Sequence, residues 1–181
     1  MNQLSDLEDS QLVRLINEDT KAFDALYHRY LPRVYRYCAQ RLNDKQQAED
    51  VCAQVFFEVL DKLMNGKYKE DGFFSAWIFT IARRRIIDHY RKPNIEPLGE
   101  SIFFDPEISK NMEDKDEQKH LLSLVQDLGE DQKELLRLRF AAQLSFEEIA
   151  KIDGRTISAI KMSIYRTLDR IRAKWEETDG K

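Results

Sequence analysis

The most regular pattern of apolar and polar positions lies near the C-terminal end of the chain. Ser145 and Glu148 have the spacing of a capping box, in which a hydroxyl and a carboxylate satisfy free backbone N–H groups of a first helical turn. This spacing predicts a helix that begins at Ser145 and ends at the Asp-Gly pair before Arg155. Thr156 is suited to cap a second helix that continues to about Trp175. The sequence therefore predicts two helices joined by a tight turn.

On the second predicted helix, apolar and polar side chains fall on different sides. The side expected to be buried consists of Ile157, Ile160, Ile164, Leu168, Ile171 and Trp175. The opposite side is small near its start and basic toward its end, with Ser158, Ala159, Met162, Ser163, Arg166 and Arg170, and Lys161 on its flank. Such a face suits entry into a DNA major groove with phosphates held at the edges. An ordinary helical hairpin with a solvated basic face would give the same pattern.

Helical spacing also dominates the first part of the chain. Asp9 or Ser10 can cap a short helix, and apolar positions continue from Phe23 to Leu42. Pro32 is expected to kink or divide the second of these helices, because proline lacks a backbone N–H.

Asp44 with Gln47 then opens a helix with a clean apolar stripe. The stripe consists of Ala48, Val51, Cys52, Val55, Phe56, Val59, Leu60 and Leu63. Phe57 points away from this stripe, on a face shared with Asp50, Gln54 and Asp61. An apolar ring among acids can dock a basic partner protein, although single exposed apolar residues are also normal on protein surfaces.

A helix is predicted from about Ser75 to Lys92, where Pro93 ends it. Its apolar residues do not fall on one face, so some rings are expected to lie beside arginines. Rings and arginines together can hold a single nucleic-acid strand through base stacking and phosphate contacts. In the alternative interpretation all the rings are buried, and the arginines only complement the helix dipole.

Residues 93–118 differ in composition, with proline and glycine interruptions and a large excess of acids. This composition is typical of a linker between two domains. After it, Leu121, Leu124, Val125 and Leu128 indicate a helix. Asp131 with Glu134 is expected to start another helix, which carries Leu135, Leu138 and Phe140 and packs against the helical hairpin.

Composition restricts the possible classes of function. With 34% charged residues, 6 glycines and 4 prolines in 181 residues, the chain fits one or two small, mostly helical domains. The N-terminus lacks the basic and apolar parts of a signal peptide, and no apolar run approaches a membrane span, so we expect a cytoplasmic protein without membrane insertion. Cys38 and Cys52 are expected to be reduced core thiols. The net charge of −4 does not indicate a nucleic-acid ligand, but acidic termini and linker can offset locally basic surfaces.

An enzyme is disfavoured. Glu49 and Asp50 are adjacent on a helix and therefore point about 100° apart. The histidines His28, His89 and His120 have no partner motif nearby.

The order of these parts resembles a sigma factor of bacterial RNA polymerase, of the extracytoplasmic-function group that keeps only the second and fourth conserved regions. The likeness covers roughly residues 10–92 and 119–175. AEDV at 48–51 with Phe56 resembles the polymerase-binding helix, and FSAWIFTIARRRIIDHYRK at 74–92 resembles the segment that melts and holds the minus-ten promoter element. LSFEEIA at 144–150, with Gly154, Ile160, Lys161 and Arg166, resembles the reader of the minus-thirty-five element.

The resemblance implies an all-α fold with a region-2-like domain at 1–92, an acidic linker at 93–118 and a region-4-like helix-turn-helix domain at 119–181. Core polymerase would be bound by Glu49, Asp50, Gln54, Phe57 and Asp61. The minus-ten element would be held by Lys67, Lys69, Trp77, Arg83, Arg84, Arg91 and Lys92. The minus-thirty-five element would be held by Arg155, Thr156, Ser158, Ala159, Lys161, Met162, Ser163, Arg166 and Arg170.

The partners implied are core RNA polymerase, through the clamp helices of its largest subunit and its upstream-facing flap, promoter DNA in duplex and single-stranded form, and an anti-sigma factor. No catalytic residue, metal or cofactor is implied, because nucleotide addition belongs to the polymerase. A helix-turn-helix regulator that acts without joining polymerase is the alternative from another class.

The chain departs from the family pattern in several places. Ala53-Gln54 stands where a Gln-Glu pair is common, and Arg84 where Asn is usual. Asp153 replaces an apolar residue before the turn glycine, and Ser163 replaces an arginine on the reading helix. Small side chains on that helix leave few hydrogen-bonding groups for direct base readout. We therefore expect the upstream element to be read partly through DNA shape and methyl contacts.

Overall fold

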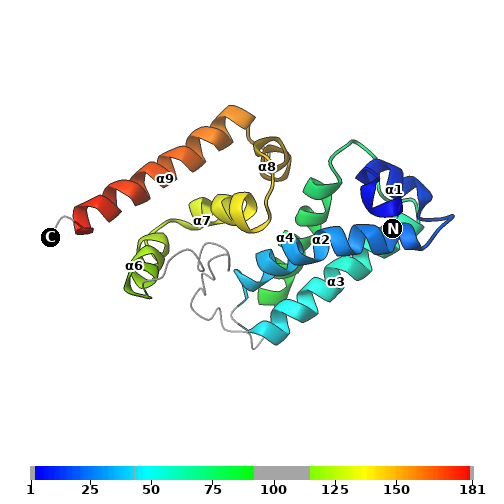
Figure 1. Cartoon of the computed structure of the whole chain (residues 1–181), viewed down its shortest axis with the longest axis horizontal. Helices are drawn as coiled ribbons and strands as arrows, with labels where there is room; N and C mark the ends of the chain where they lie inside the picture. The colour runs from blue at the N-terminus through cyan, green and yellow to red at the C-terminus, as the bar shows by residue number, and fades with distance from the viewer. Residues whose placement is uncertain (1–2, 43, 92–114, 180–181) are drawn as a thin grey trace.

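The computed structural model describes residues 3–42, 44–91 and 115–179. These ranges form helices and connecting turns, with no strand among them, which confirms the expected all-α fold (Figure 1). The termini lie at opposite ends of the view, with the first helices on one side and the last helix on the other. Within the described part of the chain no helix is long and apolar enough to cross a membrane.

The first half contains a 3₁₀ turn, η1 (Gln3–Asp6), and four helices: α1 (Asp9–Leu15), α2 (Lys21–Ala39), α3 (Lys45–Met64) and α4 (Phe74–Tyr90). The apolar stripes of α2, α3 and α4 pack on one another, and α1 packs on α2. Pro32 does not divide α2. It occupies an exposed position, while Tyr30 and Val34 on either side of it are buried. Burial of these neighbours keeps the helix continuous across the missing N–H.

The helix starts of this half were predicted to within a residue or two. The side chain of Asp44 accepts a hydrogen bond from the backbone N–H of Gln46 at 2.8 Å and so caps α3. Gln47 does not complete a capping box there, because its side chain contacts His89 at 3.1 Å. In α1 the cap is Glu8, whose backbone N–H donates to the side chain of Gln11 at 2.9 Å.

Asp9, one of the two predicted caps of α1, has a different role. Its carboxylate accepts hydrogen bonds from Arg29, at 2.5 Å, and from Tyr30. The prediction was therefore wrong by one residue, because a tertiary contact with α2 takes this carboxylate away from its own helix.

The second half contains α6 (Lys115–Gln126), α7 (Glu130–Leu136), a π-helical turn η2 (Arg137–Ala141), α8 (Phe146–Asp153) and α9 (Ile157–Asp179). Helix α9 packs against α6, α7 and α8. Helix α6 begins inside the segment predicted as a linker, 93–118. The part of that segment before Lys115 lies outside the described residues.

The helical hairpin is α8 and α9, and its predicted caps are confirmed. Ser145 accepts from the N–H of Glu148 at 3.2 Å, and the Glu148 carboxylate accepts from the N–H of Ser145 at 2.6 Å. Gly154 ends α8 in the left-handed conformation, with φ of 80°. Thr156 accepts from the N–H of Ala159 at 3.2 Å and so caps α9.

Ile157 and Phe140 were expected to be buried, and both predictions were wrong, since the side chains are 41% and 42% exposed. Ile157 is the first residue of α9, while Ile160 and Ile164, one and two turns further on, are fully buried. Phe140 lies in η2, where a π-helical turn contains about one residue more than an α-helical turn. The extra residue rotates the following side chains away from the positions that α-helical spacing predicts.

The expected start of α7 was also wrong. The helix begins at Glu130, and the N–H of Gly129 donates to the side chain of Gln132 at 3.3 Å. Glu134, the expected capping partner of Asp131, is buried. Its carboxylate contacts the first half of the chain instead.

The two halves pack against each other. Helix α4 contacts α8, and α2 contacts η2. Their buried apolar residues belong to one continuous cluster that extends from Leu12 to Ile164. Cys38 and Cys52 lie in this cluster as free thiols, and burial raises the pKa of Cys52 to about 12 and that of Cys38 still further. Both therefore behave as small apolar side chains, as expected.

Gly154 provides a test of the turn geometry. Its φ of 80° strains any residue with a Cβ, although the space around it is open within 4 Å. We expect Gly154→Ala to lower the free energy of unfolding by about 1 kcal/mol. Gly154→Asn is the matched control, because asparagine also adds a Cβ but tolerates the left-handed conformation better than alanine. Urea unfolding of the full-length variants measures the difference, and equal stabilities would contradict the role of the left-handed turn.

Candidate polymerase and promoter interfaces

The predicted polymerase-binding face lies on α3 and is open to solvent. Its members Glu49, Asp50, Gln54, Phe57 and Asp61 are all exposed, and Phe57 is exposed to 75%. Phe56, the next ring along the helix, is buried and packs edge-on against Tyr27 at 4.7 Å between ring centroids. The two phenylalanines therefore have different roles. Phe56 belongs to the core, while Phe57 offers a free aromatic side chain among acids.

The predicted minus-ten residues surround the loop 65–73 and the start and middle of α4. We call this region, from Asn65 to Arg84, the base-capture surface. Lys67 and Lys69 are exposed, while Trp77 is half-buried and lies 4.5 Å from the ring of Tyr68 and 5.6 Å from that of Phe74. The indole is thus held in place by other rings, which limits its rotamer freedom.

Arg84 is exposed, but it does not point freely into solvent. Its guanidinium donates to the buried carboxylate of Glu58 on α3, which also binds Arg85 at 2.6 Å and Lys62 at 3.1 Å. Burial alone would raise the pKa of Glu58, but the hydrogen bonds and charges of these cations outweigh burial and lower it. One carboxylate therefore orders three cations at the junction of α3 and α4.

Glu58 was missed by reasoning from the sequence. Glu58 lies at the edge of the apolar stripe of α3 and is buried with it. An acid at such a position is the signal that could have indicated a buried ion pair.

The remaining predicted minus-ten arginines differ in environment. Arg83 is half-buried and lies 3.7 Å from the carboxylate of Glu134 in the second half of the chain. Arg91 is exposed and lies 4.0 Å from Asp88. Lys92 lies outside the described residues.

The predicted minus-thirty-five face is open along α9. All its residues are exposed except Ser163, which is half-buried. A shallow depression is lined by Gln132, Ala159, Met162, Ser163 and Arg166. Arg155 is held in an ion pair with Asp153, the residue that departs from the family pattern before the turn glycine. Small side chains and one thioether therefore form the centre of this face, and cations lie at its edges.

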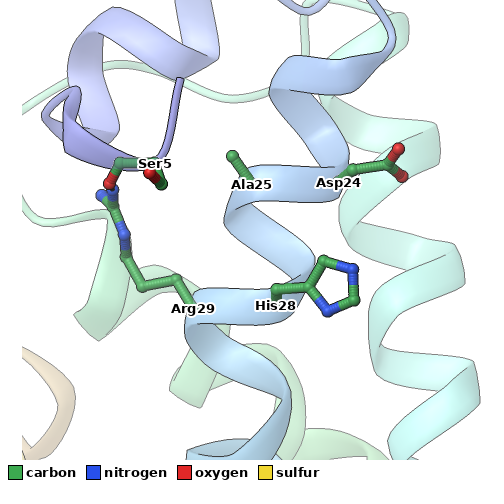
Figure 2. A pocket seen from close by; sticks show the side chains of 5 residues that line it. All are labelled: Ser5, Asp24, Ala25, His28 and Arg29. Atoms are coloured by element: carbon green, nitrogen blue, oxygen red, sulfur yellow. The ribbon is translucent and has the colours of Figure 1, made fainter. Parts of the chain in front are cut away.

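A second depression lies between η1 and α2 and is lined by Ser5, Asp24, Ala25, His28 and Arg29 (Figure 2). Arg29 donates to the carbonyl oxygens of Ser5 and Leu7 as well as to Asp9. Through these contacts, Arg29 holds η1 and the residues after it against α2. In the described part of the chain, no group of three or more His, Cys, Asp or Glu side chains is suited to bind a metal ion.

Comparison with known proteins finds two conserved regions in the same order along the chain. Residues 26–94 match Sigma-70 region 2, and residues 124–173 match Sigma-70, region 4. The sigma factor ShbA of Streptomyces griseus is 31% identical over 91% of this chain and 93% of its own length. The chain belongs to the ECF RNA polymerase sigma factors. As a sigma factor it binds core polymerase and directs promoter-specific initiation, rather than acting as an independent regulator.

Other relatives carry the same family name. The sigma factor RpoE of Cereibacter sphaeroides is 30% identical, with 89% of this chain and 91% of the relative covered. BldN of Streptomyces coelicolor is 29% identical over 91% of this chain, which spans 66% of BldN. The solved structure of CnrH in complex with the cytosolic domain of CnrY aligns with a TM-score of 0.63 at 20% identity, covering 93% of this sigma factor and 97% of CnrH. This structural likeness supports the fold.

The stability that the ion pairs of Glu58 provide depends on pH. Because the folded pKa of Glu58 is lowered, its contribution to stability is present above the ordinary carboxyl pKa of about 4.3 and is lost as the pH falls through the lower folded value. We expect Glu58→Gln to destabilise this sigma factor by roughly 1–3 kcal/mol at neutral pH. The difference from wild type should shrink below about pH 4. Chemical unfolding between pH 3 and pH 7 measures it, and a difference that is constant with pH would contradict the ionised cluster.

Proposed function

We propose that this sigma factor divides its work among three surfaces: the outer face of α3 binds core polymerase, the base-capture surface holds opened minus-ten DNA, and α9 binds the minus-thirty-five duplex. The observation that carries the proposal is the exposure of Phe57 within an acidic helix face. This ring has no place in the core, and it follows Phe56 on the helix that resembles the polymerase-binding helix of the family.

Docking on the clamp helices would bury the Phe57 ring and bring Asp50 and Asp61 next to basic groups. Buried aromatic residues at the centre of an interface commonly contribute several-fold more to affinity than their neighbours. Ala53-Gln54 carries less charge than the Gln-Glu pair common in the family. The aromatic ring is therefore expected to supply a large share of the affinity here.

The base-capture surface has the properties that single-strand binding needs. Trp77 is packed against other rings, and Lys67, Lys69 and Arg84 are exposed cations on the same loop and helix. Stacking and phosphate contacts of this kind would offset part of the few kcal/mol that each unstacked base step costs.

The upstream element would be bound by α9. Arg166 and Arg170, which are exposed, would contact phosphates, while Ala159, Met162 and Ser163 would meet the base edges. Few strong hydrogen-bonding groups face the groove, which supports readout through shape and methyl contacts. Strong guanine-specific penalties opposite these small residues in a scan of base substitutions would contradict this mode of reading.

Polymerase supplies the covalent chemistry, so this sigma factor needs no catalytic residue of its own. We place its action in the cytoplasm, where polymerase and DNA are found. An anti-sigma factor that covers the polymerase and promoter surfaces is part of the proposal. Run-off transcription from a promoter library, with core enzyme added, tests the whole assignment, and transcription no better than that of core enzyme alone would overturn it.

Phe57→Ala tests the docking face. We expect the affinity for core polymerase to fall at least about tenfold, because the variant loses a ring that the interface would desolvate. Phe140→Ala is the control, because Phe140 is also exposed but lies on η2, away from α3. Titration of labelled full-length protein with core polymerase gives both affinities. An unchanged affinity for Phe57→Ala would remove α3 from the interface.

Arg166→Ala tests the upstream contact. A lost phosphate contact should weaken binding to all duplex sequences alike and reduce the slope of log affinity against log salt by about 1. Arg172→Ala is the matched control on α9, because Arg172 is exposed but pairs with Glu176 at 3.2 Å. Fluorescence anisotropy with promoter duplexes measures the slope. A loss confined to one base pair would instead show that Arg166 reads sequence.

A further inference from the structure

The depression on the minus-thirty-five face has one wall that does not belong to the helical hairpin. Four of its lining residues lie on α9, and the fifth, Gln132, lies on α7. Helix α7 packs against α9 and so brings this half-exposed side chain to the edge of the face. The set of residues that sequence spacing assigned to this face therefore lacks one of the groups that line it.

Hydrogen bonds hold the Gln132 carboxamide at both of its polar atoms. Its Oε1 accepts from the backbone N–H of Gly129 at 3.3 Å, and its Nε2 donates to the Thr167 hydroxyl at 3.3 Å. That hydroxyl donates in turn to the carbonyl oxygen of Ser163 at 2.8 Å. Thr167 is buried, so this connection is anchored inside the domain. The amide is thus oriented before any ligand arrives.

The oriented carboxamide still has polar groups to offer to a ligand. A glutamine side chain carries two N–H donors and an oxygen with two lone pairs. Within the described part of the chain, Gly129 and Thr167 engage one lone pair and one N–H. One donor and one acceptor of the same amide therefore remain. Adenine presents the complementary pair in the major groove, the N7 acceptor and the N6 amino donor, and glutamine is a side chain that binds both at once.

The surroundings of this amide favour a base edge over a phosphate. Asp131, the preceding residue, is exposed, and a carboxylate there would repel a phosphate. The hydrogen bond and charge of Asp153 raise the pKa of Arg155, and the charge of Asp131 adds to this effect, so the start of α7 lies near the turn of the hairpin. Ala159 and Met162 in the depression suit a thymine methyl group. An A·T base pair matches both the amide and these apolar groups.

We propose that Gln132 contacts N7 and N6 of one adenine in the minus-thirty-five element, and that Thr167 is the positioning residue that orients its amide. This inference rests on the proposed binding of the upstream duplex by α9. It adds one directly read A·T base pair to an element that is otherwise read through shape and methyl contacts. The reading surface then includes a residue of α7, outside the helix-turn-helix hairpin.

Replacement of single atoms in the DNA tests the contact. A promoter recovered from the transcription library supplies a labelled duplex, and 7-deazaadenine replaces each upstream adenine of either strand in turn. This base lacks the N7 acceptor but keeps Watson–Crick pairing. With the full-length protein bound to core polymerase, we expect one position at which the replacement weakens binding at least about fivefold. Fluorescence anisotropy in competition with unlabelled duplexes measures each affinity.

Gln132→Ala should weaken binding to the natural duplex about tenfold, because the whole bidentate contact is lost. The variant should also bind the natural and the 7-deazaadenine duplexes equally at the sensitive position. Gln126→Ala is the matched control, because Gln126 is an exposed glutamine at the end of α6 that does not line the depression. It should discriminate as wild type does.

Gln132→Glu should change which base is preferred. The variant keeps the length of the side chain and an acceptor for the Gly129 N–H, but it loses the N–H that adenine N7 needs. A carboxylate instead accepts from the N4 amino group of cytosine. We expect a preference for C·G over A·T at that one base pair, with the other positions read as in wild type. A purely structural role of Gln132 would weaken binding to all duplexes alike.

Thr167→Val tests the positioning of the amide. Valine has nearly the same shape as threonine but no hydroxyl to hold Nε2 of Gln132. The ratio of affinities for the natural and 7-deazaadenine duplexes should fall toward one in this variant. Thr167→Ser restores a hydroxyl and should recover the ratio. Circular dichroism confirms that the variants remain helical.

The outcomes separate this inference from the proposed function. The inference is overturned if no upstream adenine responds to 7-deazaadenine, or if the response persists unchanged in Gln132→Ala. It is also overturned if Gln132→Glu weakens binding to all duplexes alike. If instead the wild-type protein with core polymerase binds a promoter with a scrambled upstream element as well as the natural one, α9 does not read that element and the proposed function fails.

Discussion

A buried carboxylate, that of Glu134, binds side chains of the first half of this sigma factor from the second. Glu134 brings α7 against the end of α2 and the middle of α4, where it meets Tyr37, Arg41 and Arg83. Burial, followed by the charge and hydrogen bond of Glu134, raises the pKa of the Tyr37 hydroxyl, so that this group stays a hydrogen-bond donor. Together with the packing of α8 against α4, this contact holds the second half of the chain against the first.

A second buried carboxylate organises the first half alone. Glu58 orders Lys62, Arg84 and Arg85 at the junction of α3 and α4. The three cations exceed the charge of the carboxylate by two, so the junction remains positive even though its ion pairs are satisfied. A protein with a net charge of −4 can thus present a locally basic surface to DNA. Negative charge is kept apart from this basic surface in two ways. Some acids are buried beneath arginines, and others lie in distant segments of the chain.

Exposure and burial divide the aromatic residues into distinct groups. Phe56, Phe74 and Phe79 belong to the core of the first half, while Trp77 is half-buried and packs against other rings. Phe57 alone among the rings of α3 faces solvent, next to acidic residues. The same residue type is therefore part of the core at one position and exposed to solvent one residue further along the helix.

The sequence by itself determined the helices, their caps at Asp44, Ser145 and Thr156, and the exposed acidic face around Phe57. These features depend on local spacing and on groups within one helical turn, which can be read from residue order. Tertiary structure decided the uses of Asp9, Glu58 and Glu134, the exposure of Phe140 and the contact between the halves. Each of these depends on which distant helix lies opposite a side chain, and the partners of Glu134 in the first half lie between 51 and 97 positions away along the chain. The sequence alone does not show whether a carboxylate will be surrounded by water or paired with an arginine from another helix.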